Sequence, residues 1–201
     1  MDKLKYEREL AAAGYKYICG VDEVGRGPLA GPVVCAAVIM PLEDLIEGVD
    51  DSKKLTAKKR EKLSELIREK AVACNICRIE PQIIDEINIL QATRLGMKRA
   101  VEGLQIKPDF VLTDGNMTLY IDIPQRSIIK GDMFSYSIGA ASIVAKVYRD
   151  EIMKEYALSY PEYGFEKNMG YGTAVHIQAI KEKGLTPIHR RSFTKKWQTT
   201  T

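Results

Sequence analysis

The chain has 201 residues, of which 45% are hydrophobic and 28% charged, and its formal net charge is +3. This composition is ordinary for a globular protein with one substantial core, and the mild charge does not by itself indicate a nucleic-acid binder. No apolar run approaches the roughly 20 residues that a membrane span needs, and no secretory signal follows the charged N-terminus. We therefore expect one cytoplasmic domain with a short appendage.

The first 80 residues are expected to form two helices and three strands. In chain order we expect a helix at about 2–13, strands at about 16–23 and 31–40, a helix at about 56–70 and a strand at about 71–80. The connection between the first two strands is short and rich in glycine, which predicts an antiparallel hairpin. Thr56 is a natural N-cap for the helix that follows it.

The rest of the chain mixes strands with helices. In chain order we expect a helix from Pro81 to about Lys107, a strand at 110–113, a weak strand pair within 119–130, and helices at about 133–156 and 174–183. Asp132 is the natural N-cap of the first of these last two helices, and Gly172–Thr173 caps the second, which ends at Gly184. This order predicts an α/β domain with a mixed sheet.

The four cysteines include a Cys-x-x-Cys pair, Cys74 and Cys77, which can mark a zinc or redox site. Residues three apart on a strand point to opposite faces, which does not suit a shared metal. Cys19 and Cys35 lie inside apolar strands with no histidine nearby. We expect all four to be buried, reduced thiols.

The most informative stretch is 21–32, where an apolar strand ends in two adjacent acids, Asp22 and Glu23. Buried carboxylates need a compensating cation, because an unpaired buried charge is costly. Gly25, Arg26 and Gly27 follow, and two glycines around an arginine would let a phosphate or sugar approach the backbone. The alternative is a strand followed by a glycine turn whose acids face water.

Two further acids stand where a predicted element meets a glycine. Asp114 ends the strand at 110–113, and Asp132 follows Gly131. Carboxylates without histidine or cysteine suit Mg²⁺ or Mn²⁺, and four of them favour a two-ion site acting on a phosphodiester. Adjacent strand residues face opposite ways, so we expect Asp22 to bridge the ions, and Glu23 to reach them past the strand end, through its main chain or through water.

A Ser-Lys-Lys turn at 52–54 opens the strongly basic first half of the helix at 56–70. Two interpretations carry equal weight. The turn and helix could contact a phosphate backbone, or the charges could form an ordinary solvated face.

Seven motifs make the sequence resemble the bacterial type 2 ribonuclease H family, ribonuclease HII, from about residue 5 to 194. They are VDEVGRGPLAGP, DSKKL, TDG, KGD, SIGAASIVAKVYRD, GYGT and HRRSF. The resemblance implies a ribonuclease H-like fold, with a catalytic domain over 1–155 and a C-terminal helical region over 156–201 that contributes to substrate binding. It also implies hydrolysis of RNA in RNA/DNA hybrids and incision 5′ of single ribonucleotides in duplex DNA, leaving 5′-phosphate and 3′-hydroxyl ends.

The resemblance also assigns roles to individual residues. The family's ligands for two Mn²⁺ or Mg²⁺ ions match Asp22, Glu23, Asp114 and Asp132. The loop that reads the ribose 2′-hydroxyl, the group that distinguishes RNA from DNA, matches Gly25, Arg26 and Gly27. The tyrosine that packs on the deoxyribose at the RNA–DNA junction matches Tyr171, for which loop packing is the alternative. Contacts to the substrate backbone match Ser52, Lys53 and Lys130.

Other expectations concern partners and rival functions. We expect a monomer in which the N-terminal extension of some relatives is absent or was removed, and no sliding-clamp peptide with paired aromatics after Gln198. We expect structural or phosphate-facing roles for His176 and His189. One rival is a general nuclease or phosphotransferase of the same superfamily. Another is a non-catalytic hybrid-binding module, against which the acids argue, because carboxylates repel phosphates unless metals intervene.

Overall fold

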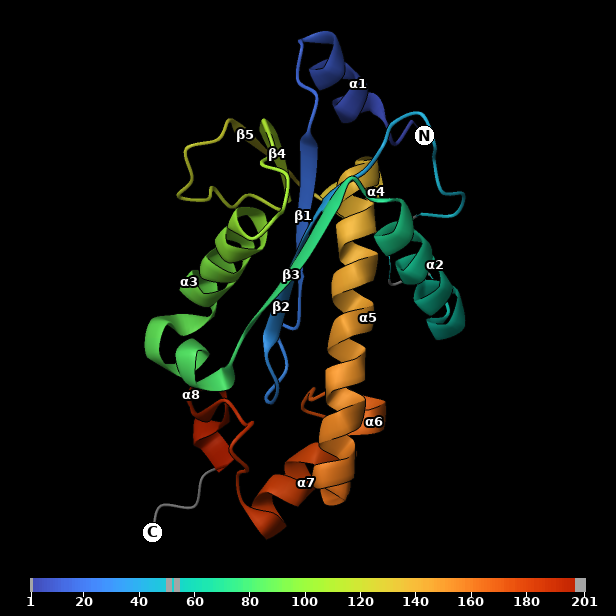
Figure 1. The fold of residues 1–201 in the computed structure, drawn as a ribbon. Coiled ribbons are helices and arrows are strands. Elements are labelled where there is room, and N and C mark those ends of the chain that lie inside the picture. The colour runs from blue at the N-terminus through green and yellow to red at the C-terminus, as the bar shows by residue number, and fades with distance from the viewer. Residues whose placement is uncertain (1, 50–51, 53–54, 198–201) are drawn as a thin grey trace.

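The computed structural model describes residues 2–49, 52 and 55–197, and its centre is one mixed sheet in the order β3-β2-β1-β4-β5 (Figure 1). β2 pairs antiparallel with both β1 and β3, and β4 runs parallel to both β1 and β5. The expected mixed sheet, which has five strands, and its first hairpin are confirmed. The strands are β1 Ile18–Val24, β2 Val33–Ile39, β3 Ala73–Ile79, β4 Phe110–Asp114 and β5 Gln125–Ile128.

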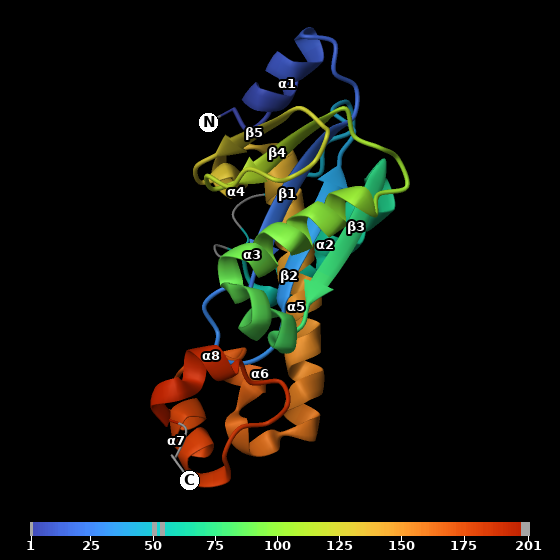
Figure 2. The ribbon, with the colours of Figure 1, turned by 90° about the vertical axis from the view of Figure 1, so that its left-hand side faces the viewer.

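Helices cover both faces of the sheet, α2 and α5 on one face and α3 on the other (Figures 1 and 2). Shorter helices lie at the two ends of the molecule. The helices are α1 Lys5–Ala12, α2 Ala57–Lys70, α3 Pro81–Glu102, α4 Gly131–Phe134, α5 Tyr136–Ser159, α6 Phe165–Asn168, α7 Ala174–Lys183 and α8 Arg191–Thr194, with short 3₁₀ turns at Pro161–Tyr163 and Lys195–Trp197. No helix among the residues placed by the structure is long and apolar enough to cross a bilayer.

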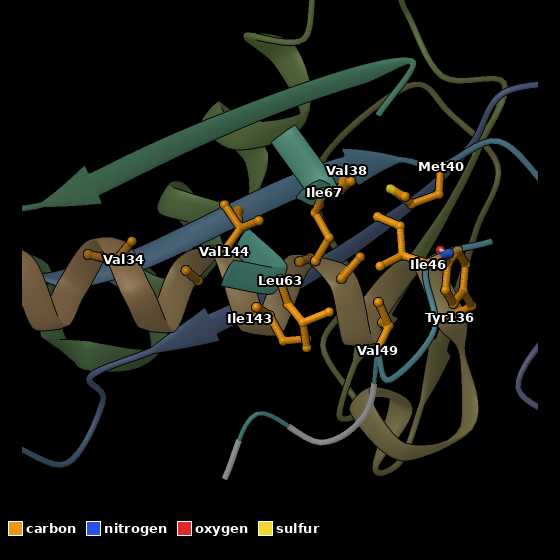
Figure 3. Close-up of a cluster of buried hydrophobic side chains, with 14 of the residues drawn as sticks. Val34, Val38, Met40, Ile46, Val49, Leu63, Ile67, Tyr136, Ile143 and Val144 are labelled. Atoms are coloured by element: carbon orange, nitrogen blue, oxygen red, sulfur yellow. Dashed lines mark hydrogen bonds between the residues drawn. The ribbon is translucent and has the colours of Figure 1, made fainter. Parts of the chain in front are cut away.

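The interior strand β2 contributes to the core on both faces of the sheet, because successive strand residues point to opposite sides. Val34, Ala36 and Val38 pack with α2 and α5 in the cluster drawn in Figure 3. Cys35 and Ala37 pack on the other face with α3. Every residue of β2 is buried, so its sequence is apolar throughout and does not alternate.

Helix α5 approaches β1 so closely that only glycine fits at the crossing. A Cβ atom on Gly20 would lie 2.1 Å from the backbone carbonyl carbon of Ser137. The first half of α5 is correspondingly rich in small residues, including Gly139 and Ala140. This contact brings the hydroxyl of Ser142 onto the face of β1 that carries Asp22.

Two sequence expectations about residues 119–156 are wrong. The helix expected over 133–156 is divided, because Ser135 adopts an extended conformation (φ −122°, ψ 132°) and its hydroxyl accepts the N–H of Ile138. Asp132 is therefore not the N-cap of α5 but lies within α4. Only β5 forms within 119–130, since the side-chain amide of Gln125 bonds both backbone groups of Leu119 and replaces strand pairing there.

Several local expectations hold. Thr56 and Thr173 cap α2 and α7 with their side chains, and Pro81 starts α3. All four cysteines are free thiols, although Cys74 and Cys77 are only half-buried. An unexpected kink interrupts α3 at Asn88 (φ 65°).

The C-terminal helices α6 to α8 lie at one end of α5, beyond the sheet (Figures 1 and 2). They surround their own apolar cluster, which includes Phe165 and Ile180 but also Leu29 from the loop after β1. The division expected at residue 155 falls inside α5, which continues to Ser159. The assignment of 156–201 as a separate substrate-binding region stays a prediction.

Candidate active site

Two of the four predicted acids lie side by side at one edge of the sheet. β1 and β4 are parallel, with Val21 opposite Thr113, so Asp22 and Asp114 follow at the carboxyl ends of neighbouring strands. This edge is where open α/β sheets bind ligands. β5 ends beside them, with Ile128 opposite Asp114, and the chain continues from there into α4 and Asp132.

Asp22 is buried, with 5% of its surface exposed, and it faces α5. Its Oδ1 accepts the N–H of Glu23 at 2.7 Å, and the Ser142 hydroxyl donates to its carboxylate. Burial, and then the negative charges of Glu23 and Asp114, raise the pKa of Asp22 well above its ordinary value. A cation at this position would favour the ionised carboxylate.

Glu23 follows on the opposite face of β1, as expected from the alternation of a strand. Burial raises the pKa of Glu23 to about 7, against the opposing effect of Arg26. Its Oε1 lies 3.4 Å from Nη1 of Arg26. Glu23 also experiences the charge of Asp114, so the three acids share one region of negative potential.

Asp114 is hydrogen-bonded to Gly131, the residue that precedes Asp132 in the sequence. Oδ1 of half-buried Asp114 accepts the N–H of Gly131, while Asp132 is 7% exposed within α4. Within 2–49, 52 and 55–197, no three acidic, histidine or cysteine side chains are grouped closely enough to hold an ion. The four-ligand set therefore stays a prediction.

The donor chemistry nevertheless fits a divalent ion. The groups that meet at this edge are carboxylate oxygens, which suit hard cations such as Mg²⁺ or Mn²⁺. The raised pKa values of Asp22 and Glu23 have burial as their first cause and neighbouring negative charge as a further one. A bound cation would offset both effects.

The loop at 25–27 follows β1 directly. Gly25 has φ +90°, and a Cβ there would lie 2.2 Å from Nε of Arg149, so glycine is required. Arg26 and Gly27 are exposed. Among the residues that the structure describes, no hydrogen bond engages the N–H groups of Arg26 and Gly27, which leaves these donors available to a ligand.

Tyr171 lies beside this loop although it is 144 positions away from Gly27 in the sequence. A Cβ on Gly27 would lie 3.5 Å from Cε1 of Tyr171. The tyrosine is 48% exposed, and its carbonyl accepts a hydrogen bond from Nδ1 of His176 at 2.9 Å. The structure thus brings together an exposed aromatic ring and the glycine loop.

The residues predicted to contact the phosphate backbone of the substrate differ in their exposure to solvent. Ser52 is buried, and its hydroxyl bonds that of Ser142 at 2.9 Å, so its side chain faces inward in this structure. Lys130 is exposed and adopts a left-handed conformation (φ 58°) just before α4. Lys53 lies outside the described residues.

Sequence reasoning missed the buried polar residues that support the site. Arg149 and Arg190 are fully buried and donate to carbonyls of the loop after β1. Both lie in motifs quoted above, but a basic residue in a motif gives no sign of whether it faces solvent. His176 and His189 are buried with their Nε2 atoms 3.0 Å apart, so in this structure neither ring faces solvent.

Comparison with known proteins identifies the family. A family model described as Ribonuclease HII matches residues 19–196. A Ribonuclease HII from Ligilactobacillus salivarius is 56% identical over 192 residues, covering 96% of this chain and 75% of the relative. Among solved structures, the ribonuclease H2 of Pyrococcus horikoshii superposes with a TM-score of 0.79 at 27% identity, covering 91% of this chain and 97% of that one.

A second solved structure, a complex of PCNA with RNase HII from Archaeoglobus fulgidus, has a TM-score of 0.75 at 25% identity, covering 92% of this chain and 98% of that one. The expectation about a clamp peptide concerns residues after Gln198, which are not described here, and stays a prediction. The sheet order, the family match and the level of sequence identity all support the same family assignment. This chain belongs to the ribonuclease HII family and is a nuclease of the ribonuclease H type.

Proposed function

We propose that this enzyme, which hydrolyses RNA in RNA/DNA hybrids, also incises 5′ of single ribonucleotides embedded in duplex DNA. The observation that carries the proposal is the position of the loop at 25–27. Its uncommitted N–H groups stand between Asp22, which precedes them on β1, and the exposed ring of Tyr171. A loop that binds one 2′-hydroxyl beside the acids requires only a single ribose in the substrate.

The roles of the residues follow from their surroundings. The N–H groups of Arg26 and Gly27 would bond the 2′-hydroxyl, and Tyr171 would pack on the next sugar. Lys130, exposed beside the acids, would contact the phosphate backbone. Ser52 and Lys53 are assigned to the same backbone by the family motif alone.

Asp22, Glu23, Asp114 and Asp132 would hold two divalent ions. Such ions supply activation of a water and stabilisation of the leaving 3′-oxygen, which yields a 5′-phosphate and a 3′-hydroxyl. Ser142 would hold Asp22 in the orientation needed for ligation, since its hydroxyl already donates to that carboxylate. Arg26 would release Glu23 on substrate binding, because its guanidinium is exposed and can turn toward a phosphate.

The test compares three duplexes of one sequence: all-DNA, DNA with one ribonucleotide, and an RNA/DNA hybrid. Mg²⁺ and Mn²⁺ are titrated separately, and product ends are identified by mass. We expect a single cut 5′ of the ribonucleotide and no cut in the all-DNA duplex. Equal cleavage of the all-DNA duplex would mean that the loop does not read the ribose, and would favour a general nuclease. Full activity in chelator would refute the role of the acids.

A further inference from the structure

The side chain of Arg190 supports the loop at 25–31 from inside the protein. Its Nη1 donates to the carbonyl of Arg26 at 2.9 Å, and its Nη2 donates to the carbonyls of Gly25 and Gly31. Its Nε also donates to Gly31, at 3.0 Å. A guanidinium has only donors. Arg190 therefore holds three carbonyl groups of one loop toward the protein interior.

The backbone around Arg190 is fastened to the same loop. Its N–H donates to the carbonyl of Leu29 at 2.8 Å, and the N–H of Gly31 donates to Ile188 at 2.8 Å. Asp85 of α3 in turn accepts the N–H groups of the next two residues. Arg190 thus has a fixed position from which to orient the loop.

The buried guanidinium of Arg190 supplies donors that the loop carbonyls need. Arg190 is completely buried, and its charge is met by neutral carbonyl oxygens. An apolar side chain at this position would leave the carbonyls of Gly25, Arg26 and Gly31 without their donor, which is unfavourable for buried groups. Burial, with the charge of Arg149 nearby, lowers the pKa of Arg190 to about 9, which still leaves it protonated at neutral pH.

We propose that Arg190 is a positioning residue for recognition of the ribose 2′-hydroxyl. By holding the carbonyls of Gly25 and Arg26 inward, it presents the N–H groups of Arg26 and Gly27 to the substrate sugar. Arg190 touches no substrate itself. The inference rests on the ribose-reading function proposed above for this loop.

The experiment measures two constants for each variant. KM is obtained with a duplex that contains one ribonucleotide, and Ki with the all-DNA duplex of the same sequence as competitor. For Arg190→Ala we expect KM to rise about tenfold, because the loop amides lose their orientation, while Ki changes by less than about twofold. Arg190→Lys, which keeps the charge but loses the planar fork, should give an intermediate KM.

A matched control separates positioning from loss of stability. Met97→Ala truncates a fully buried residue of α3 in the core cluster on the other face of the sheet. Partial unfolding lowers the concentration of active enzyme, so this control should lose apparent kcat while KM stays unchanged. The same pattern in Arg190→Ala would overturn the inference.

Two other outcomes are also decisive. If Arg190→Ala does not fold, Arg190→Lys carries the test: a rise in KM of about threefold or more supports the inference, and an unchanged KM overturns it. If the wild-type enzyme cuts the all-DNA duplex as fast as the ribonucleotide duplex, the proposed function fails first, and the inference about Arg190 fails with it.

Discussion

The buried histidine pair should make the stability of the protein depend on pH. The N–H of Thr186 donates to Nδ1 of His189 at 2.9 Å, so the proton of neutral His189 is on Nε2. That N–H then donates to Nε2 of His176, whose Nδ1–H donates to the carbonyl of Tyr171. The chain of bonds is complete when both rings are neutral. A proton on Nδ1 of His189 would break the bond from the N–H of Thr186 and leave only the Thr186 hydroxyl, 2.8 Å away, as its acceptor.

Burial, and then the proximity of His176, lower the pKa of His189 from 6.5 to about 4. The unfolded chain therefore binds one more proton than the folded chain between these two values. The stability contributed by neutral His189 is complete above pH 6.5 and is lost as the pH falls toward 4. A shift of this size is worth about 3 kcal/mol in full, of which about 2 kcal/mol should be lost by about pH 5.

The assay is urea unfolding of the wild type and of His189→Gln at a series of pH values from about 8 to about 5. The difference between the unfolding free energies of the two proteins cancels the pH dependence of groups that titrate equally in both, including Asp22 and Glu23. We expect the stability advantage of the wild type to shrink by about 2 kcal/mol over this range. An advantage that is the same at both ends would refute the assignment of a neutral, buried His189.

Three further predictions concern glycines and acids. Gly25→Ala should lower the free energy of unfolding by about 1–3 kcal/mol, because its Cβ would lie 2.2 Å from Nε of Arg149. Gly27→Ala should leave thermal unfolding unchanged and weaken only substrate binding. Gly20→Ala should cost about 3 kcal/mol or more in denaturant unfolding, because its Cβ would overlap the backbone of α5. Asp114→Asn should abolish cleavage while leaving hybrid binding, measured by fluorescence anisotropy, largely intact; a variant that still cuts normally would refute its role as a ligand.

Local signals in the sequence predicted a large part of the fold. Caps such as Thr56 and Thr173, and the proline at Pro81, act within one helical turn, so their effect can be read from neighbouring residues. The hairpin of β1 and β2 depends on a short connection and was equally local. The break at Ser135 was not visible, because a small polar residue among other small residues is compatible with a continuous helix.

Part of the candidate site was predictable because it also depends on local signals in the sequence. Asp22 and Asp114 end apolar strands, and the parallel pairing of those strands makes the two acids neighbours. The proximity of Tyr171 to Gly27 depends instead on the packing of the C-terminal region against the loop after β1. Nothing in the spacing of the sequence reports such a contact, and the family motif alone singled out this tyrosine among 10.

Asp22 and the loop at 25–31 are held by different side-chain contacts. Asp22 is fixed by α5 through Ser142, whereas the loop is fixed by the C-terminal region through Arg190. The end of β1 joins the two, and α5 also reaches the far end of the loop, because Arg149 donates to the carbonyls of Ala30 and Pro32. A perturbation of the contact between Ser142 and Asp22 should act on kcat, since it moves a proposed ligand of the metal ions. A perturbation of the C-terminal contact should act on KM and on discrimination between ribose and deoxyribose, because it moves the groups that recognise the sugar.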